Sequence, residues 1–229
     1  MAAAIIVAAG KGNRMQERLR KQYLPLAGTP ILVRTLTVID ACRSVDCIYL
    51  VVPQDDFDFC REHILSRLKP ARRVHLVAGG ARRQDSVYNG LQQIDANCKI
   101  VLIHDGVRPF VKNDQLVASI NGARQFGACI LGVPAYDTLK RVDTSDNIVG
   151  TLSRDAVWLA QTPQTFRYDL IRKAYDLART DRYIGTDDAS LVERLGEPVK
   201  IIRGSRSNIK ITNKEDLKIA QSLIEGAAW

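Results

Sequence analysis

The sequence predicts an α/β protein with a Rossmann-like, mostly parallel β-sheet, helices on both faces and a protruding β-hairpin arm. The first observation is that short runs of Val, Ile and Leu alternate with amphipathic segments of helical spacing. The second is a break in this alternation over residues 137–160, which predicts the arm. A length of 229 residues suits one domain, so we expect residues 1–229 to form a single unit that carries this arm.

The alternating segments predict the strands of the sheet and the helices that cover it. Strands are predicted where a short apolar run ends at a Pro or Gly, as before Pro53 and Pro134. The predicted strands are Ala3–Ala8, Ile48–Val52, Val74–Val77, Ile100–His104, Ala128–Val133 and Val199–Ile202. Apolar residues with helical periodicity predict the helices. These are Ile31–Ala41, Asp55–Leu68, Asp85–Ile94, Asp114–Phe126, Tyr168–Leu177, Asp188–Leu195 and Glu215–Ile224, the last capped by Thr212 or Asn213.

Two strands around a polar turn account for the arm. Leu139–Asp143 and Ile148–Ser153 flank the turn Thr144–Asn147. An isolated hairpin is only marginally stable in water, so the arm needs a surface to pack against. A second copy of the chain is the simplest source of that surface. We therefore expect a homodimer that forms through residues 137–160.

A formal net charge of +8 indicates anionic partners. Nucleic acid is one candidate, but the basic clusters fall mostly at predicted loops. They also lack the interleaved aromatic side chains of a base-stacking surface. Small phosphorylated substrates fit this distribution better, so we expect no nucleic-acid partner.

The sequence also argues against a membrane protein, a secreted protein and a zinc protein. The apolar opening Met1–Gly10 lacks a charged leader and runs into a Gly/Lys/Arg loop, which favours a buried strand over a signal peptide. No stretch approaches the roughly 18 apolar residues of a membrane span. Five cysteines without a Cys-x-x-Cys pair, and three scattered histidines, indicate reduced structural thiols. We expect a cytoplasmic protein without a membrane partner.

The loop after the first strand, Ala8–Met15, carries the strongest local signal. A Gly-rich turn after such a strand directs backbone N–H groups to the carboxyl edge of the sheet, where phosphates bind. Two familiar Gly-rich loops do not match. No Gly-Lys-Ser/Thr follows, and Met15 stands where the dinucleotide-binding fingerprint has its third Gly. Arg14 and Lys21 would, with Mg²⁺, offset the charge that develops when a triphosphate is attacked at its α-phosphorus. The alternative is a surface loop with solvated cations.

This loop and seven further segments resemble one enzyme family. Together with Lys21–Leu26, the loop resembles the start of the sugar-phosphate nucleotidyltransferases. The segments that narrow the resemblance are Gly79-Gly80 with Asp85–Val87, His104–Pro109, Asp137–Lys140, Gln161–Gln164, Gly185–Ala189 and Asn208–Lys210. In this order, over nearly the whole chain, they are similar to the 2-C-methyl-D-erythritol 4-phosphate cytidylyltransferase family of the non-mevalonate isoprenoid pathway. The fold that this resemblance implies is of the nucleotide-diphospho-sugar transferase type.

The resemblance implies a reaction as well. CMP would pass from CTP to 2-C-methyl-D-erythritol 4-phosphate, giving 4-diphosphocytidyl-2-C-methyl-D-erythritol and pyrophosphate. The attacking phosphate oxygen is already ionised, so a direct in-line displacement needs no general base. The implied cofactor is Mg²⁺, bound through the CTP phosphates with Asp105 as a further ligand.

The family's site residues can be carried over to matching positions of this sequence. The catalytic cations match Arg14, Lys21 and Lys210. The nucleotide contacts match Ala8, Ala9, Gly10, Gly12, Gly80, Ala81, Ser86 and Asp105. The contacts to the polyol phosphate match Asp105, Arg108, Thr138, Lys140, Arg154 and Thr162, of which the arm residues would reach across a dimer interface. Ala81 departs from the family, which often has an acidic residue there, so any contact at this position would be through the backbone.

Simpler interpretations stay open for several of these residues. Asp105 would also serve as a cap or turn residue, and Arg108 either pairs with a carboxylate or reaches the substrate. Lys140 and Arg154 would by themselves be interpreted as a solvated strand face. The adjacent carboxylates Asp187–Asp188 are explained more simply as the acidic N-terminus of a helix than as a metal site.

Two alternative functions remain. Ribitol 5-phosphate cytidylyltransferases form a sister family, and Val107 followed by Phe110 is more typical of that family. Thr138–Arg141 and Asn208–Lys210 are more similar to the methylerythritol enzyme. The more distant alternative is a non-enzymatic protein that binds RNA or another polyanion. That alternative explains the charge but not the ordered set of loops.

Overall fold

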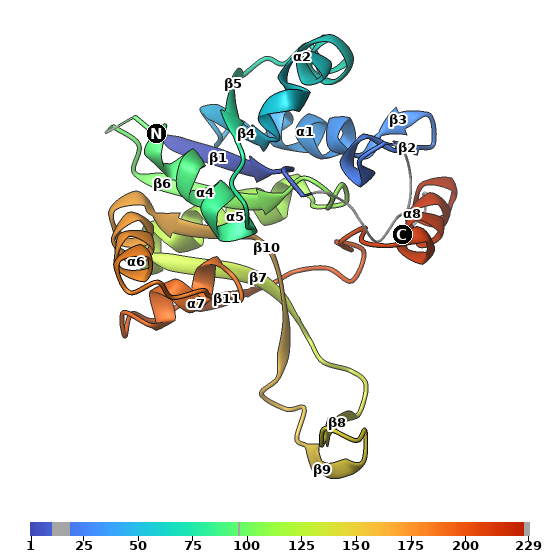
Figure 1. The fold of residues 1–229 in the computed structure, drawn as a ribbon, viewed down its shortest axis with the longest axis vertical. Helices are drawn as coiled ribbons and strands as arrows, with labels where there is room; N and C mark the ends of the chain where they lie inside the picture. The colour runs from blue at the N-terminus through green and yellow to red at the C-terminus, as the bar shows by residue number, and fades with distance from the viewer. Residues whose placement is uncertain (11–18, 96, 227–229) are drawn as a thin grey trace.

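The computed structural model describes residues 1–10, 19–95 and 97–226. A seven-stranded sheet in the order β11-β7-β10-β6-β1-β4-β5 forms its centre (Figure 1). The strands are β1 (Ala2–Val7), β4 (Cys47–Val52), β5 (Arg73–Ala78), β6 (Ile100–Asp105), β7 (Ala128–Pro134), β10 (Trp158–Arg167) and β11 (Lys200–Arg203). Neighbouring strands are parallel except where β10 pairs with β6 and with β7. The predicted, mostly parallel sheet is confirmed.

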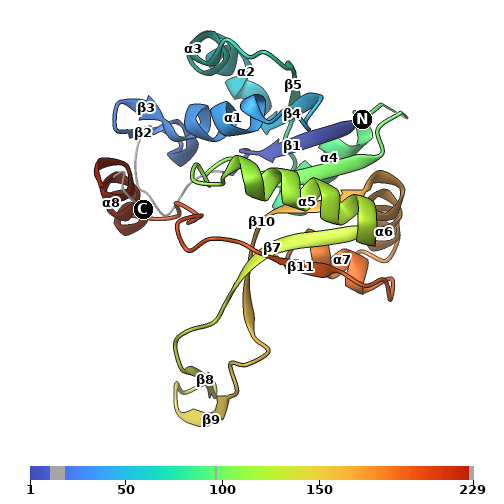
Figure 2. The same cartoon turned by 180° about the vertical axis from the view of Figure 1, so that it is seen from behind.

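Helices cover both faces of the sheet, as Figures 1 and 2 show. The helices on one face include α1 (Ile31–Ala41) and α5 (Asn113–Phe126), and those on the other are α4 (Arg83–Gln92), α6 (Tyr168–Thr180) and α7 (Asp188–Glu193). Strand β1 shows why both faces are covered. Ile6 packs in the core cluster of the first face, whereas its neighbour Ile5 packs in that of the second. Successive strand residues point to opposite faces, so an unbroken apolar run must be buried on both.

The predicted helix Asp55–Leu68 is helical but irregular. It consists of a 3₁₀ turn η3 (Gln54–Asp56), α2 (Phe57–Phe59), a π-helical stretch η4 (Cys60–Leu65) and α3 (Ser66–Leu68). Its buried side chains in the π-helical stretch are Cys60 and Ile64. The segment ends at Lys69, whose φ of 47° is the left-handed conformation that commonly follows a helix.

Strand β10 was not predicted, and it lies in the interior of the sheet, between β7 and β6. Its middle segment, Gln161–Gln164, is polar and contains a proline, and both features are rare in a central strand. The structure accommodates the proline because the pairing of β10 with β7 shifts register between Gln161 and Gln164. The polar side chains Gln161, Thr162, Gln164 and Thr165 are nevertheless buried. Hydrophobic periodicity therefore could not reveal this strand.

The C-terminal helix α8 (Lys214–Glu225) packs beside the carboxyl edge of the sheet. Asn213 is its N-cap, because the Asn213 side chain accepts a hydrogen bond from the Asp216 N–H at 2.8 Å. A small cluster joins α8 to the ribbon of β2 (Pro25–Leu26) and β3 (Thr29–Pro30). Its buried members are Leu26, Ile31, Val107, Ile211 and Ala220. This packing holds the segments that carry Lys21 and Lys210 at one edge of the sheet.

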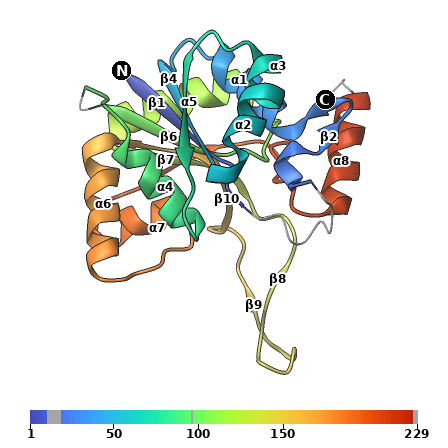
Figure 3. The same ribbon diagram turned by 45° about the horizontal axis from the view of Figure 1, so that its top comes forward.

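The arm is a hairpin of β8 (Leu139–Val142) and β9 (Ile148–Leu152), as predicted. Figures 1 and 3 show it extending away from the sheet and its helices. Its base continues the pair formed by β7 and β10, with the Ala135 N–H donating to the Val157 carbonyl at 2.9 Å. Ile148 and Val149 of the arm are 65% and 50% exposed. Within the described part of one chain, the arm has no core of its own.

All five cysteines are buried and free, which agrees with structural thiols. Burial raises the pKa of the Cys129 thiol to about 12, so this thiol is kept in its unreactive protonated form. None of the helices described here combines the length and the apolar character that crossing a bilayer would require.

Candidate functional site

A cleft of about 420 Å³ lies at the carboxyl ends of β1 and β6, where ligands bind in open α/β sheets. Most of the residues that were predicted to contact the nucleotide or act on its phosphates line this cleft. They are Ala8, Ala9, Gly10, Lys21, Gly80, Ala81, Ser86, Asp105 and Lys210. Residues far apart in the sequence therefore meet at one edge of the sheet, as the resemblance implied. Arg14 and Gly12 lie outside the described residues.

The two glycines after β5 have no space for a larger side chain, and the second of them, Gly80, lines the cleft. A β-carbon on Gly79 would lie 2.2 Å from Cβ of Ala9, and one on Gly80 would lie 2.4 Å from Cβ of Asp85. The Ser86 hydroxyl fixes this turn: it accepts from the Gly80 N–H at 3.0 Å and donates to the Arg82 carbonyl at 3.0 Å. Glycine at these positions keeps the turn tightly packed against both neighbouring segments.

Gln22 is a cleft residue that the sequence reasoning did not single out. Its side chain is buried and donates to the carbonyl oxygen of Ala8 at 2.7 Å. It thereby ties the Lys21 segment to the first strand. The only sequence signal was its position beside Lys21 in the family-like segment.

Asp105 is the centre of charge in the cleft. It ends β6, is 5% exposed, and forms ion pairs with Arg83 at 3.1 Å, Lys210 at 2.9 Å and Arg108 at 3.5 Å. Burial alone would raise the pKa of this carboxyl group. The positive charges of Arg83, Lys210 and Arg108 outweigh burial and hold the pKa of Asp105 well below its ordinary value. Asp105 is therefore a carboxylate at any physiological pH.

Arg83 was noted in the sequence only as part of a basic cluster, yet it connects two buried carboxylates. Its Nε donates to Asp105, and its two Nη atoms donate to Asp188 at 3.0 and 2.8 Å. Asp188 is fully buried and also accepts a hydrogen bond from the Tyr175 hydroxyl. Nothing in the local sequence distinguishes Arg83 from Arg82, because its partners come from distant segments.

Asp187 and Asp188 do lie at a helix N-terminus, as the simpler interpretation held. Asp187 is the N-cap of α7 and its side chain accepts from the Ser190 N–H at 3.0 Å. Asp188 is the first residue of that helix and faces Arg83. Among the residues that the structure describes, no group of three or more His, Cys, Asp or Glu side chains could hold a metal.

Arg108 and Thr162 contact Asp105 but do not line the cleft. The Arg108 side chain is 12% exposed and donates to the Asn208 carbonyl at 2.7 Å, in addition to its ion pair with Asp105. The Thr162 hydroxyl accepts from the Asp105 N–H at 3.1 Å and is hydrogen-bonded to Nδ1 of His104 at 3.0 Å. Arg108 was expected either to pair with a carboxylate or to reach the substrate, and the structure shows its ion pair with Asp105. Contact of either residue with a substrate stays a prediction.

The arm residues Thr138, Lys140 and Arg154 are exposed and do not line the cleft of their own chain. The Lys140 ammonium donates to the Thr151 hydroxyl at 2.7 Å across the hairpin. Arg154 donates to the carbonyl oxygen of Tyr136. One chain therefore does not bring the arm side chains together with the Asp105 cluster.

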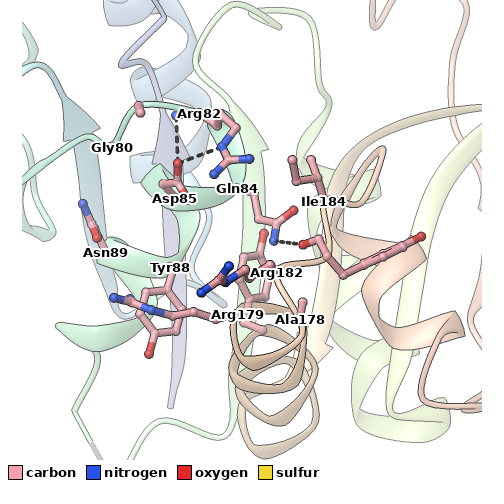
Figure 4. A pocket seen from close by; sticks show the side chains of 13 residues that line it. Gly80, Arg82, Gln84, Asp85, Tyr88, Asn89, Ala178, Arg179, Arg182 and Ile184 are labelled. Atoms are coloured by element: carbon pink, nitrogen blue, oxygen red, sulfur yellow. Dashed lines mark hydrogen bonds and ion pairs between the residues drawn. The ribbon is translucent and has the colours of Figure 1, made fainter.

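A second hollow of about 500 Å³ lies between α4 and α6 (Figure 4). It is basic, with Arg82, Arg179 and Arg182 among its lining residues. Arg82 pairs with Asp85 at 3.3 Å, and the Arg179 guanidinium lies 4.7 Å from the centre of the Tyr88 ring. Although this hollow is larger, it contains neither Asp105 nor the predicted catalytic cations of the described residues. The cleft at Asp105 is therefore the candidate active site.

The donor groups of the cleft fit a magnesium ion only if phosphate oxygens supply most of its ligands. Asp105 is the only carboxylate among the described residues that line the cleft. Mg²⁺ is commonly held by one or two carboxylates together with substrate phosphates and water. The cleft has one carboxylate, Asp105, and two lysines, Lys21 and Lys210, and this set matches that arrangement.

Comparisons with known proteins show which family the chain resembles. A sequence model of the family described as 2-C-methyl-D-erythritol 4-phosphate cytidylyltransferase matches residues 2–226. The protein of that name from Geobacter metallireducens is 47% identical, over 97% of both chains. The solved structure of 4-diphosphocytidyl-2C-methyl-D-erythritol synthase from Anaerococcus prevotii is 35% identical, with a TM-score of 0.88 over 98% of this chain and 96% of that one.

A further solved structure carries the same fold. The cytidylyltransferase of the same description from Thermus thermophilus is 29% identical, with a TM-score of 0.80 over 97% of this chain and 98% of that one. The matching segments extend over the sheet, the cleft and the hairpin arm alike. The chain therefore belongs to the 2-C-methyl-D-erythritol 4-phosphate cytidylyltransferase family.

Proposed function

We propose that the chain transfers CMP from CTP to 2-C-methyl-D-erythritol 4-phosphate, forming 4-diphosphocytidyl-2-C-methyl-D-erythritol and pyrophosphate in the non-mevalonate isoprenoid pathway. The observation that carries the proposal is the cleft, where the backbone of Gly10 and the closely packed turn at Gly80 lie beside the charged groups Lys21, Asp105 and Lys210. Such a combination suits the binding of a nucleoside triphosphate and the neutralisation of its phosphates.

The chemistry requires positioning and charge more than acid–base groups. An ionised oxygen of the polyol phosphate attacks the α-phosphorus of CTP. A new P–O bond forms as the bond to the bridging oxygen breaks, and pyrophosphate leaves. Lys21 and Lys210, with Arg14 from the family resemblance, offset the charge that builds between reactants that repel each other. Asp105 would hold a Mg²⁺ ion that is bound to the CTP phosphates, and that ion would supply further neutralisation.

We also propose that two chains form a homodimer through residues 137–160. The exposed apolar side chains of the arm support this, because an isolated two-stranded hairpin is marginal in water. In such a dimer Thr138, Lys140 and Arg154 of one chain would reach the polyol phosphate in the cleft of the other. Free, buried cysteines support a reducing compartment, and we place the protein in the cytoplasm.

The test is release of pyrophosphate from CTP and Mg²⁺ with one of two acceptors. Turnover with 2-C-methyl-D-erythritol 4-phosphate and not with ribitol 5-phosphate is the expected result. Turnover with ribitol 5-phosphate alone would keep the chemistry and change the substrate. Binding of RNA that weakens steeply with salt, without turnover of CTP, would contradict an enzymatic role.

A further inference from the structure

We propose that Arg83 is a positioning residue for the transfer reaction. It holds the Asp105 carboxylate, and through that carboxylate the Lys210 ammonium, in the orientation that the reaction needs. The inference rests on the proposed function, because Lys210 is there assigned to act on the α-phosphate. Neither the family resemblance nor the cleft by itself gives Arg83 this role.

The two oxygens of Asp105 are held by different cations. Oδ1 accepts from Nε of Arg83 at 3.1 Å, whereas Oδ2 lies 2.9 Å from Nζ of Lys210. The terminal torsion of an aspartate is broad, so a carboxylate held through only one oxygen can rotate. Lys210, whose side chain is 38% exposed, would then lose a fixed partner on the cleft side. Arg83 thus controls the direction from which Lys210 approaches the phosphates.

Arg83 is itself held from the far side by a rigid anchor. Its two Nη atoms donate to the two oxygens of Asp188 at 3.0 and 2.8 Å, and Asp188 is fully buried. Tyr175 of α6 donates a further hydrogen bond to Asp188. A planar guanidinium that engages one carboxylate through two nitrogens has its orientation defined as well as its position. The chain of contacts therefore runs from α6 and α7 through Arg83 to the cleft.

A purely stabilising role explains this arrangement less well. Buried ion pairs contribute little net stability, since the cost of removing charge from water offsets their attraction. Joining α4 to α7 would require only the pair of Arg83 with Asp188. The additional bond from Nε to Asp105 is not needed for that connection, and it fixes one oxygen of the carboxylate at the centre of the cleft.

Arg83→Lys is the variant that tests the proposal. Lysine keeps the positive charge but cannot donate to Asp105 and to both oxygens of Asp188 in one plane. We expect kcat to fall by about tenfold to a hundredfold, the cost of a small misplacement at a reacting centre, and KM for CTP to stay within about threefold. Arg172→Lys is the matched control: this arginine is 31% exposed against 30% for Arg83 and pairs with Asp176 at 3.0 Å, away from the cleft. Its kinetics should stay those of the unmodified chain.

A double-mutant cycle with Asp105→Asn distinguishes positioning from other roles. If Arg83 acts through Asp105, Arg83→Lys adds no further loss once Asp105 is changed. Three results would each overturn the proposal. The losses of the two variants could be additive, kcat of folded Arg83→Lys could be unchanged, or Arg83→Lys could raise KM for CTP without lowering kcat. The last result would mean that Arg83 contacts the nucleotide directly.

A second variant and a second readout cover the case in which Arg83→Lys does not fold. Asp188→Asn leaves the cleft side chains unchanged and should lower kcat in the same manner if the anchor matters. Independently of activity, the rate at which an amine-reactive reagent labels Lys210 should rise several-fold in either variant. Unchanged labelling and unchanged kcat in Asp188→Asn would overturn the proposal. Absence of turnover in the unmodified chain would instead contradict the proposed function.

Discussion

The cleft and the arm differ in whether their charged side chains have buried partners within one chain. In the cleft, Asp105 is paired with three cations and Arg83 with two carboxylates. On the arm, the described hydrogen bonds of Lys140 and Arg154 go to the exposed Thr151 and to the Tyr136 carbonyl just before the arm. The cleft is organised by the fold of a single chain, whereas the arm presents both charge and apolar surface outward.

This difference indicates what each region needs in order to work. A buried network of charges is stable only when it is fully paired, and the described charges around Asp105 are paired within a single chain. An exposed apolar hairpin gains stability only by packing against another surface. We therefore expect changes in the cleft to affect chemistry directly and changes in the arm to affect chemistry through association.

The largest expected effect is that of Lys21→Ala in the cleft. Removing one cation aimed at the triphosphate should lower kcat by about 10²–10³-fold, by analogy with deletion of one oxyanion donor. Pyrophosphate release measures this, with the melting temperature showing that the fold is kept. The control is Arg73→Ala, which removes an exposed arginine at the start of β5 and should change kcat little. Near-normal turnover of folded Lys21→Ala would contradict the mechanism.

A smaller effect is expected from Ile148→Lys at the tip of the arm. Placing a charge on an apolar residue that is 65% exposed should weaken the dimer, and kcat should fall by about tenfold as the arm leaves the partner's cleft. Sedimentation analysis follows the oligomeric state. Leu177→Lys on α6, at a position that is 40% exposed and off the arm, is the control. A fully active monomer would show that each chain works alone.

Mixing Lys21→Ala with Lys140→Ala, each of which should be largely inactive alone, tests whether the arm acts on the partner's cleft. Lys21→Ala keeps a normal arm, and Lys140→Ala keeps a normal cleft. If the arm acts across a symmetric dimer, random exchange of subunits should restore about a quarter of the normal activity, because half of the dimers then contain one complete site. No recovery, under conditions where subunit exchange is demonstrated, would place the arm on its own cleft.

The smallest expected effect on turnover belongs to His104, which instead affects stability. Burial lowers the pKa of His104 to about 4, against an ordinary value near 6.5. Between about pH 4 and pH 6.5, this histidine is therefore protonated in the unfolded chain and neutral in the folded chain. The free energy of unfolding is unaffected by this group well above pH 6.5 and falls as the pH drops toward 4, by about 2 kcal/mol at pH 5.

His104→Gln should remove that part of the pH dependence. Denaturant unfolding between pH 8 and pH 5 measures it, as a difference between the variant and the unmodified chain. The pKa values of Asp105 and Asp216 are lowered, so their contributions are lost mainly at lower pH. Parallel curves for the two proteins over this interval would contradict the buried, neutral state of His104. The arm has no buried histidine, and changes there should leave this dependence unaltered.

Much of the fold could be predicted because its signals are local. The apolar run of β1, the helix Ile31–Ala41 and the polar turn of the arm each follow from the spacing of residues that are close in the sequence. The Gly-rich loop and Gly80 could be assigned to the carboxyl edge because they follow strands. Local signals also explained Asp187 as a helix cap.

The contacts between distant segments were decided only by the tertiary structure. Strand β10 can lie in the interior of the sheet because its polar side chains have hydrogen-bond partners, such as the bond from Gln164 to Asp187 at 2.7 Å. Arg83 joins Asp105 and Asp188, and Arg108 turns inward to Asp105. Sequence spacing carries no record of such pairs, because the free energy of a buried polar group depends on partners that only the folded chain brings within hydrogen-bonding distance.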